Sequence, residues 1–413
     1  MKIGVHFSAR KANGGIYQYS VTFIEAVLQM KGVEVLIFNA SDDLPEHLWN
    51  SPHCKVIPLT DHVHQQLEIS PRSPKKTRLL SIWKAKILQF LPQWIELAMF
   101  DLYERRKAKI VEGEHPDLLL FPTSAELSYL TAIPSIVAIH DLQHRLNPQF
   151  PEVSRNGQYN KRERLYKHLT QRAVHLISDS EVGKEDIVQL YSVDPDSITP
   201  LPYLPPDYLE PTLTREDAST RLAAPWAASP FFFYPAQLWP HKNHQQLIRA
   251  FAEVHAIHPN ASLVLVGQDK PIWGVRNAIN SLARALGVSE AIHHLGYVTN
   301  AEMSALYRLA TGLVMPTYFG PSNIPILEAW RMRCPVVYSD IRGCREQAGD
   351  AALLADPNNP HAIARHMLEL LENPDIRLTL IAKGEKQLDN WTISHFVATL
   401  QEVIQYIYEK THR

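Results

Sequence analysis

Two junctions between a loop and a helix in the second half of the chain carry residue types suited to binding a phosphate ester. The first reads PTYFGPSNIPILEAW over residues 316–330, and its proline-containing start predicts a helix from about Ile324. Backbone N–H groups at such a start, together with the helix dipole, form an anion site. Glu328, about one turn inside, could accept two hydrogen bonds from a ribose diol or act as an ordinary acid that complements the dipole.

The second junction reads YPAQLWPHKNH over residues 234–244, again the end of a strand, a loop and a helix start. Lys242 falls at the beginning of this helix, where a cation opposes the dipole. The misfit is explained if Lys242 balances a bound diphosphate, but a solvated lysine fits the position equally well.

Other familiar chemical signatures are absent from the sequence. It has no GxGxxG dinucleotide motif, no GxxxxGK[ST] triphosphate loop, no HExxH and no GxSxG. The segment 194–196 fits a DxD metal–diphosphate pattern, but its proline-rich surroundings favour a turn. Two histidine pairs have metal-like spacing without a third ligand nearby, His62/His64 and His241/His244. We therefore expect no metal ion.

The elements that must position these residues alternate short apolar runs with helix-like patterns, as in a doubly wound α/β domain. In the first half, strands are predicted at 2–9, 33–39, 117–122, 135–141 and 175–180. In the second half, they are predicted at 231–234, 261–267, 292–298, 312–316, 334–340 and 351–355. Helices are predicted at 242–258, 301–310 and 359–371.

The organisation predicted for the chain is two α/β domains facing each other across a cleft. Prolines between 194 and 230 are expected to interrupt any regular element and to mark the linker. The predicted units are an N-terminal domain over 1–205, a C-terminal domain over 206–390 and an amphipathic helix over 391–413 that packs back toward the first domain.

Composition narrows the class of protein further. The 413 residues include 41 lysines and arginines against 43 aspartates and glutamates, a net charge of −2, which gives no field for gathering nucleic acid. Three scattered cysteines offer no disulfide framework and favour a reducing compartment. No apolar run is long enough to span a membrane. The expected location is cytoplasmic, at most on the inner face of the membrane.

Taken together, the motifs resemble retaining glycosyltransferases of family four, which have the GT-B fold of two facing Rossmann-like domains. The family's donor signature is two glutamates separated by seven residues. Glu328, in the sequence Ile-Leu-Glu-Ala, matches the second, while Gly320 stands where the first would be. The Gly-Pro-Ser-Asn-Ile-Pro loop looks like a variant within the family. Its sugar contacts are expected from the main-chain N–H groups of Ser322, Asn323 and Ile324.

The resemblance extends along nearly the whole chain. The family grips the donor diphosphate with an arginine and a lysine five residues apart; Lys242 matches the lysine, and Gln237 replaces the arginine. Further matches are the Gly14-Gly15 loop, His140-Asp141 where the family's histidine approaches the transferred sugar, Val298 near the nucleotide base, and 342–346 after the donor helix. Gly14-Gly15 is equally consistent with a simple turn, and His140 with a strand-end residue bonded to a carbonyl.

The resemblance implies catalytic roles for His140, Asp141 and Lys242. It implies a donor site formed by Gly14, Gly15, Gln237, Lys242, Val298, Gly320, Pro321, Ser322, Asn323, Ile324 and Glu328. The expected reaction is retaining transfer of a sugar from a nucleoside-diphosphate sugar to a glycan or lipid-linked acceptor, without a cofactor, in surface polysaccharide synthesis. A non-catalytic nucleotide-sugar-binding scaffold, and an epimerase or hydrolase of sugar nucleotides, are the alternatives.

One basic segment bears on the acceptor. Residues 72–109 hold ten lysines and arginines against three acidic residues, with tryptophan and phenylalanine interleaved. Such a segment could lie on an anionic membrane and bring a lipid-linked acceptor to the cleft, or it could be a helical cover of the N-terminal core with solvated lysines.

Overall fold

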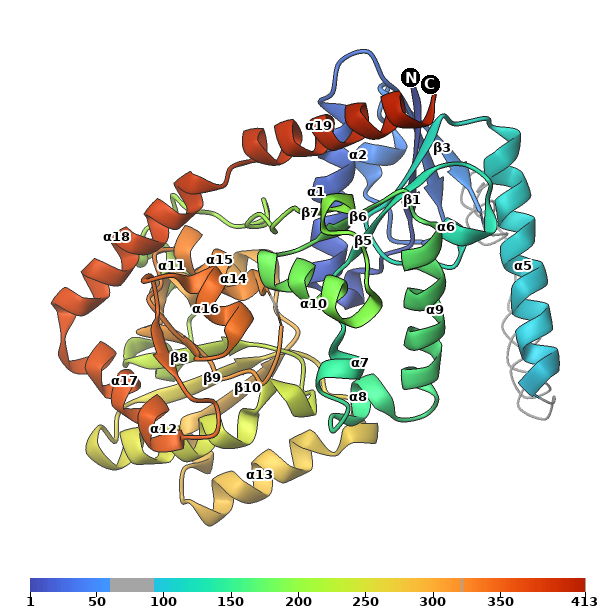
Figure 1. Ribbon diagram of the computed structural model, residues 1–413. Helices are drawn as coiled ribbons and strands as arrows, with labels where there is room; N and C mark the ends of the chain where they lie inside the picture. The colour runs from blue at the N-terminus through green and yellow to red at the C-terminus, as the bar shows by residue number, and fades with distance from the viewer. Residues whose placement is uncertain (60–92, 321, 413) are drawn as a thin grey trace, which may run out of the picture.

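The computed structural model describes residues 1–59, 93–320 and 322–412 and contains two parallel sheets, each covered by helices on both faces (Figure 1). The first sheet has the strand order β3-β2-β1-β4-β5-β6-β7 and the second the order β10-β9-β8-β11-β12-β13. Both orders reverse direction at one point, between β1 and β4 and between β8 and β11. Two doubly wound α/β sheets are therefore confirmed.

The first sheet is built from the N-terminal half of the chain. Its strands are β1 (Lys2–Phe7), β2 (Glu34–Asn39), β3 (Cys54–Pro58), β4 (Leu118–Phe121), β5 (Ser135–Ile139), β6 (His175–Ser178) and β7 (Ile198–Pro200). Its helices are α1 (Gly15–Leu28), α2 (Glu46–Trp49), α5 (Gln93–Gly113), α6 (Leu127–Leu130), α7 (Gln143–Leu146), α8 (Pro151–Ser154), α9 (Gln158–Arg172) and α10 (Glu181–Tyr191). Short 3-10 turns lie at η1 (Lys11–Asn13) and η2 (Pro195–Ser197).

The second sheet repeats the arrangement. Its strands are β8 (Phe231–Pro235), β9 (Ser262–Val266), β10 (Ile292–Gly296), β11 (Gly312–Met315), β12 (Val336–Ser339) and β13 (Leu353–Ala355). Its helices are α11 (Arg215–Arg221), α12 (His244–Ile257), α13 (Val275–Ala285), α14 (Asn300–Leu309), α15 (Ile324–Arg331), α16 (Arg342–Ala348), α17 (Pro360–Glu372) and α18 (Pro374–Asn390). The 3-10 turns are η3 (Pro225–Ala228), η4 (Pro240–Lys242), η5 (Pro271–Trp273) and η6 (Ser289–Ala291).

Burial on both faces explains why the central strands are continuous apolar runs rather than alternating ones. In β8, Phe231, Phe232, Phe233 and Tyr234 are all buried, with helices on either side of the sheet. The central pairings are parallel, with Val5 opposite Leu120 and Leu313 opposite Phe233. Parallel strands bring their carboxyl ends to one edge, so the loops that follow β1, β5, β8 and β11 are the loops positioned for function.

The proline-rich stretch between the sheets is more ordered than predicted. It contains η2, the strand β7, the helix α11 and η3, so the expectation that its prolines interrupt every regular element is wrong. The physical reason is their placement. Pro200 ends β7, an edge strand with a pairing partner on one side only, and Pro195 and Pro225 occupy the first turns of 3-10 helices, where no N–H is needed. Strand β3 was also not predicted.

The last helix, α19 (Ile393–Thr411), leaves the second half and packs on the first sheet (Figure 1). Phe396, Leu400, Ile404 and Ile407 are buried in the same core as β1 and α1. At about 1.5–3 kcal/mol for each fully buried apolar side chain, this contact fixes the end of the chain to the N-terminal half. The predicted return of the C-terminal helix is confirmed. No helix in the described part of the chain is long and apolar enough to cross a membrane.

Candidate functional site

Most of the predicted site residues lie at the carboxyl ends of the strands, on the loops after the switch-point strands β1, β8 and β11 and on the loop after β5. Gly14 and Gly15 follow β1, and His140 follows β5. Gln237 and Lys242 follow β8, and the loop leading to Glu328 follows β11. In open α/β sheets the crevice outside these ends, where the strand order reverses, is the usual ligand site.

The starts of helices α1 and α15 meet across the two halves of the molecule. Gly14 has φ 57° and ψ −113°, a conformation open to glycine, and starts α1 without a side-chain cap. A Cβ atom added to Gly15 would lie 3.0 Å from Cδ1 of Ile324, the first residue of α15. The first turns of α1 and α15, which carry the positive ends of their helix dipoles, therefore lie close together, and this geometry suits an anion.

Lys242 lies on the loop after β8, which packs against the end of β11, the strand that leads to α15. Its loop is held against the end of β11 by Asn243, whose Nδ2 donates to the Pro316 carbonyl at 2.8 Å, and by the Tyr318 N–H, which donates to the His241 carbonyl at 2.8 Å. Within the described residues, no hydrogen bond or ion pair engages the Lys242 ammonium group. Burial lowers the pKa of Lys242 to about 8. A bound anion would relieve this cost.

The pKa of Lys242 predicts how anion binding depends on pH. A bound diphosphate favours the protonated lysine, so binding takes up a proton once the free lysine begins to lose it, above about pH 8. We expect the affinity for a nucleoside diphosphate to fall about thirtyfold between pH 7 and pH 9.5, since one proton is linked over that range. Isothermal titration across this range measures it. Lys242→Arg should flatten the profile, and an equally steep profile in that variant would contradict the assignment.

Gln237 joins the two halves instead of supplying a charge. Its Nε2 donates to the carbonyl of Ala12, in the turn before Gly14, at 2.9 Å. The amide therefore holds the loop after β8 against the loop after β1. It is a neutral donor where the resemblance implies an arginine.

His140 has both ring nitrogens engaged. Nε2 lies 2.8 Å from the carbonyl of Pro122, to which it must donate, so Nδ1 accepts from the Tyr203 hydroxyl at 2.9 Å. Burial lowers the pKa of His140, which keeps the ring neutral. The ring therefore has no free lone pair to take a proton. Its contacts are those expected of a polar residue at the end of a strand that is hydrogen-bonded to a neighbouring carbonyl group.

Asp141 is held by an ion pair. Burial alone would raise its pKa, but the Arg162 guanidinium and the Gln143 N–H together hold the pKa of the carboxyl below its usual range. The same carboxylate accepts the Gln143 N–H at 3.0 Å, which orders the turn into α7. Asp141 is thus a fixed negative charge at the edge of the site.

Glu328 is buried, with 7% of its surface exposed, and both of its oxygens are bonded. The hydroxyl of Tyr208 donates to Oε1 at 2.5 Å, and that of Tyr307 donates to Oε2 at 2.6 Å. Burial raises the pKa of the carboxyl, although both tyrosines oppose the shift. Each oxygen keeps one further acceptor position, so a diol could bind only by sharing the carboxylate with the tyrosines or displacing one.

The conformation of the loop before α15, and the position of Asn323 in it, explain why residue 320 is glycine. Gly320 has φ 131°, and an added Cβ would lie 2.7 Å from Nδ2 of Asn323, so the Asn323 amide fills the place of a side chain. The Asn323 N–H donates to Oε1 of Gln347 at 2.9 Å. In this structure Gln347 occupies the N–H that we expect to contact the sugar, and that contact stays a prediction. The Ser322 hydroxyl is buried and has no partner among the described residues, which do not include Pro321.

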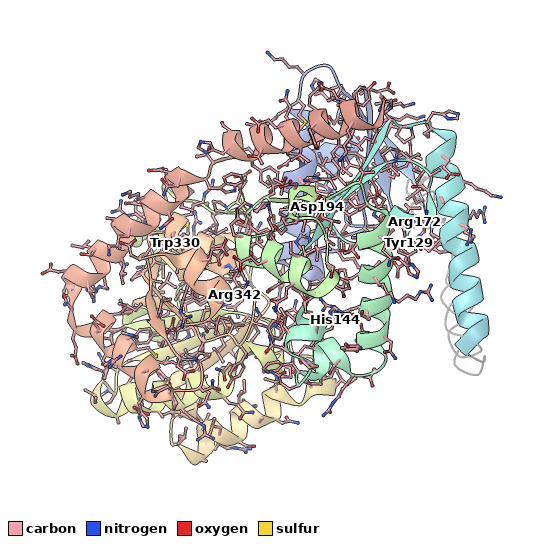
Figure 2. All side chains as sticks on the ribbon, in the orientation of Figure 1. Tyr129, His144, Arg172, Asp194, Trp330 and Arg342 are labelled. Carbon is pink, nitrogen blue, oxygen red and sulfur yellow. The ribbon has the colours of Figure 1, made fainter. Side chains whose placement is uncertain are left out.

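Two further contacts hold the halves together beside the site. Both oxygens of Glu346 on α16 accept N–H groups at the start of α10, those of Glu181 and Val182, each at 2.8 Å. Arg342, also on α16 and labelled in Figure 2, pairs with Glu185 and Asp186 of α10. The predicted match at 342–346 thus contacts the opposite half of the molecule.

Several other predictions can be placed. Val298 packs against the second core just before α14, whereas His62 and His64 lie outside the described residues. Oδ1 of Asp194 accepts the Asp196 N–H at 3.0 Å, the turn predicted for that segment. No group of three metal-ligating side chains occurs among the described residues. All three cysteines are free.

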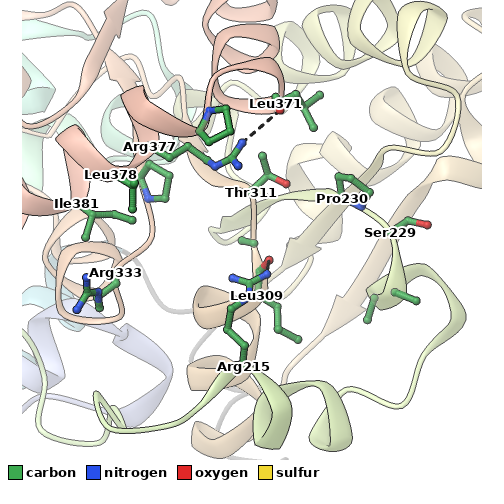
Figure 3. Close-up of a pocket in the computed structure, with 15 residues that line it drawn as sticks. Arg215, Ser229, Pro230, Leu309, Thr311, Arg333, Leu371, Arg377, Leu378 and Ile381 are labelled. Carbon is green, nitrogen blue, oxygen red and sulfur yellow. Dashed lines mark hydrogen bonds between the residues drawn. The ribbon is translucent and has the colours of Figure 1, made fainter.

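A pocket of about 530 Å³ lies at the opposite edge of the second sheet, beside the amino ends of its strands (Figure 3). Arg215 and Arg377 line it and donate to carbonyls at the ends of α14 and α17; the bond from Arg377 to Leu371 is 3.2 Å. Cations at helix C-termini complement the dipoles. These arginines therefore have a structural role. They lie at the amino ends of the strands, whereas the predicted site residues lie at the carboxyl ends.

Two doubly wound sheets whose switch-point loops face each other define the GT-B class of fold, and solved structures agree. The chain superposes on crystal structures of Anabaena Alr3699/HepE in complex with UDP and glucose (TM-score 0.73, 16% identity) and of WaaG, a glycosyltransferase involved in lipopolysaccharide biosynthesis (TM-score 0.65, 15% identity). The alignment covers 98% of this chain and 99% of each of those chains. The predicted GT-B fold is confirmed.

Sequence comparison points to the same class for the C-terminal half. Residues 225–387 match the model of the family described as glycosyl transferases group 1. The O-antigen chain mannosyltransferase B of Escherichia coli is 28% identical over 222 residues, 51% of this chain and 55% of that protein. The D-inositol 3-phosphate glycosyltransferase of Corynebacterium glutamicum (strain R) is 24% identical over 281 residues, 66% of each protein. The chain thus spans about half to two thirds of the length of these relatives.

Proposed function

We propose that this protein is a glycosyltransferase of the retaining family-four type. It moves a sugar from a nucleoside-diphosphate sugar to a glycan or lipid-linked acceptor in surface polysaccharide synthesis. The observation that carries the proposal is the Lys242 ammonium group, which has no partner among the described residues, together with the contact between the starts of α1 and α15. The match of residues 225–387 to group 1 glycosyl transferases and the similarity to an O-antigen mannosyltransferase support it.

In the proposed mechanism the donor lies on the second half. Its diphosphate sits between Lys242 and the start of α15, its ribose on Glu328 and its base near Val298. Breaking the anomeric bond places negative charge on the diphosphate, where Lys242 and the helix starts stabilise it more in the transition state than in the ground state. This differential stabilisation is the main catalytic contribution of the protein.

The proton of the acceptor hydroxyl goes to the leaving phosphate, and the acceptor attacks the face from which the phosphate departs. The bonding of His140 supports this route, because its ring donates to Pro122 and accepts from Tyr203 and so has no free lone pair for a proton. Asp141 is paired with Arg162 and acts as a fixed charge. No protein base is needed in this scheme.

Product analysis tests the proposal. The protein is incubated with UDP-glucose, and separately with GDP-mannose, with and without a lipid-diphosphate-linked disaccharide, and the products are examined by NMR. We expect a new glycosidic bond with the anomeric configuration of the donor, formed only when acceptor is present. Inversion of configuration would overturn the retaining assignment. A donor altered without acceptor would favour an epimerase or hydrolase.

The non-catalytic alternative has one observation in its favour, because the Gln237 amide is bonded to Ala12 and brings no charge to the diphosphate. A scaffold would bind the nucleotide sugar tightly and transfer nothing to any acceptor. Donor consumption measured over a panel of lipid-linked and free oligosaccharide acceptors separates the two functions.

Membrane contact through 72–109 is part of the proposal, and part of that segment lies outside the described residues. If the basic residues bind anionic lipid, changing Lys84, Lys86, Arg105 and Arg106 to Ser should reduce flotation with phosphatidylserine liposomes at least tenfold, since each charge near the surface contributes about 1 kcal/mol. Neutral phosphatidylcholine liposomes are the control. Equal flotation of the variant and the wild type would remove the idea.

A further inference from the structure

One carboxylate from the N-terminal half reaches into the candidate site. Glu152, on the short helix α8, accepts the His241 N–H at 2.9 Å and lies 2.5 Å from Nδ1 of the same residue through the same oxygen, Oε1. Burial lowers the pKa of His241 to about 4, so the ring is neutral and donates. His241 also holds the pKa of Glu152 below its usual range against the effect of burial, so the carboxylate is charged.

The second oxygen of this carboxylate is unused. Oε2 of Glu152 is buried and has no hydrogen-bond partner among the described residues, and only 2% of the side chain is exposed. An unsatisfied charged oxygen is costly to bury. Oε2 of Glu152 is therefore suited to a ligand that donates hydrogen bonds.

Glu152 lies beside the loops of the second half. The ring of His241 stacks on Phe319 with centroids 3.9 Å apart, and Phe150, two residues before Glu152, packs against Phe319 with centroids 5.4 Å apart (α8 in Figure 1). The loop 316–323 itself contains no acidic residue, and Asn323 fills the direction of a side chain at Gly320. Glu152 therefore brings a carboxylate from the N-terminal half to the loop after β11.

Lys242 is the cation next to this carboxylate in the site. Its ammonium group, one residue after His241, also has no partner among the described residues, and Glu152 is one of the charges acting on it. A buried acceptor and a neighbouring cation, both unsatisfied, fit a ligand that carries hydroxyl groups next to an anionic group. A sugar joined to a diphosphate has this chemistry.

We propose that Glu152 binds hydroxyl groups of the transferred sugar through Oε2 and so helps to select the sugar of the donor. This inference rests on the proposed function. It also gives the N-terminal half a direct contact with the donor, and the bond to His241 couples donor binding to the packing of the two halves.

The test compares nucleotide sugars with bare diphosphates. Affinities for UDP-glucose, UDP, GDP-mannose and GDP are measured by isothermal titration on the wild type and on Glu152→Gln, which keeps an oxygen for His241 and replaces the other by an NH₂ group. We expect Glu152→Gln to weaken binding of the preferred nucleotide sugar about tenfold or more and to change the matching diphosphate less than about twofold, because the lost bond is to a charged group.

Glu346→Gln is the matched control, because it makes the same chemical change at another carboxylate that bridges the halves. It should change both ligands by the same factor. If Glu152→Gln weakened binding of the nucleotide sugar and of the diphosphate equally, or weakened neither, the role of Glu152 would be overturned. The proposed function would stand. Failure of the wild type to bind any of the four would overturn the proposed function together with this inference. Circular dichroism melting of both variants verifies that they fold.

Discussion

Lys242→Met is expected to lower kcat/KM for sugar transfer at least 100-fold. In the proposed mechanism the ammonium group stabilises the oxygen atoms on which negative charge develops, and removing one such preorganised group typically costs a factor of about 10²–10³. Release of the nucleoside diphosphate in the presence of acceptor measures the rate. Stability should not fall, because methionine is of similar length and the ammonium group of the half-buried Lys242 has no partner among the described residues to lose.

A second lysine provides the control for this prediction. Lys383 pairs with Asp350 on the surface, with 40% of its side chain exposed. Lys383→Met makes the same chemical change away from the candidate site and should leave kcat/KM within twofold of the wild-type value. If Lys242→Met also retained more than a tenth of the wild-type kcat/KM, diphosphate stabilisation by Lys242 would be refuted.

Glu328→Gln is expected to remove the preference for a ribose diol. Wild-type protein should bind UDP or GDP, whichever is preferred, at least tenfold more tightly than its 2′,3′-dideoxy analogue, because a buried carboxylate accepts strong hydrogen bonds. In the variant the ratio should fall toward one. The free energy of unfolding should also fall by about 1–3 kcal/mol, since one of the two tyrosine hydroxyls loses its charged acceptor. Calorimetric titration and urea unfolding measure the two quantities.

Tyr208→Phe separates the two effects of Glu328. It disturbs the same cluster but keeps the carboxylate, and it frees Oε1 for the ligand. The diol preference should persist in this variant. An unchanged preference in Glu328→Gln would show that the ribose binds elsewhere and that Glu328 serves only the two tyrosines.

Much of the fold was predictable from the sequence because buried parallel strands leave long apolar runs. The triple phenylalanine of β8 and the helix from Ile324 were placed within a residue or two of their positions, and the amphipathic pattern of α19 predicted its packing on the other half. Strand β7 was missed because it is only three residues long and ends in proline. Its stability comes from pairing with β6, which a local pattern does not contain.

The candidate site was predictable only for residues that carry their own local signal. Lys242 opposes a helix dipole, and Glu328 lies one turn inside a helix after a glycine-rich loop. Their partners have no such signal, because Tyr208 meets Glu328 across 120 residues of sequence and Glu152 meets His241 across 89. An acidic residue in a four-residue helix has no feature that sets it apart until the fold brings it to the loop after β8.

The most direct test of the central claim is thermal stabilisation of the wild type and of Lys242→Met by UDP, GDP, dTDP and ADP. If the meeting point of α1 and α15 binds a diphosphate, one nucleotide should stabilise the wild type by about 2.7 kcal/mol at 100 times its dissociation constant. The stabilisation should be largely lost in Lys242→Met. If none of the four stabilises the wild type, or if the same nucleotide stabilises both proteins equally, the donor site is not where we place it.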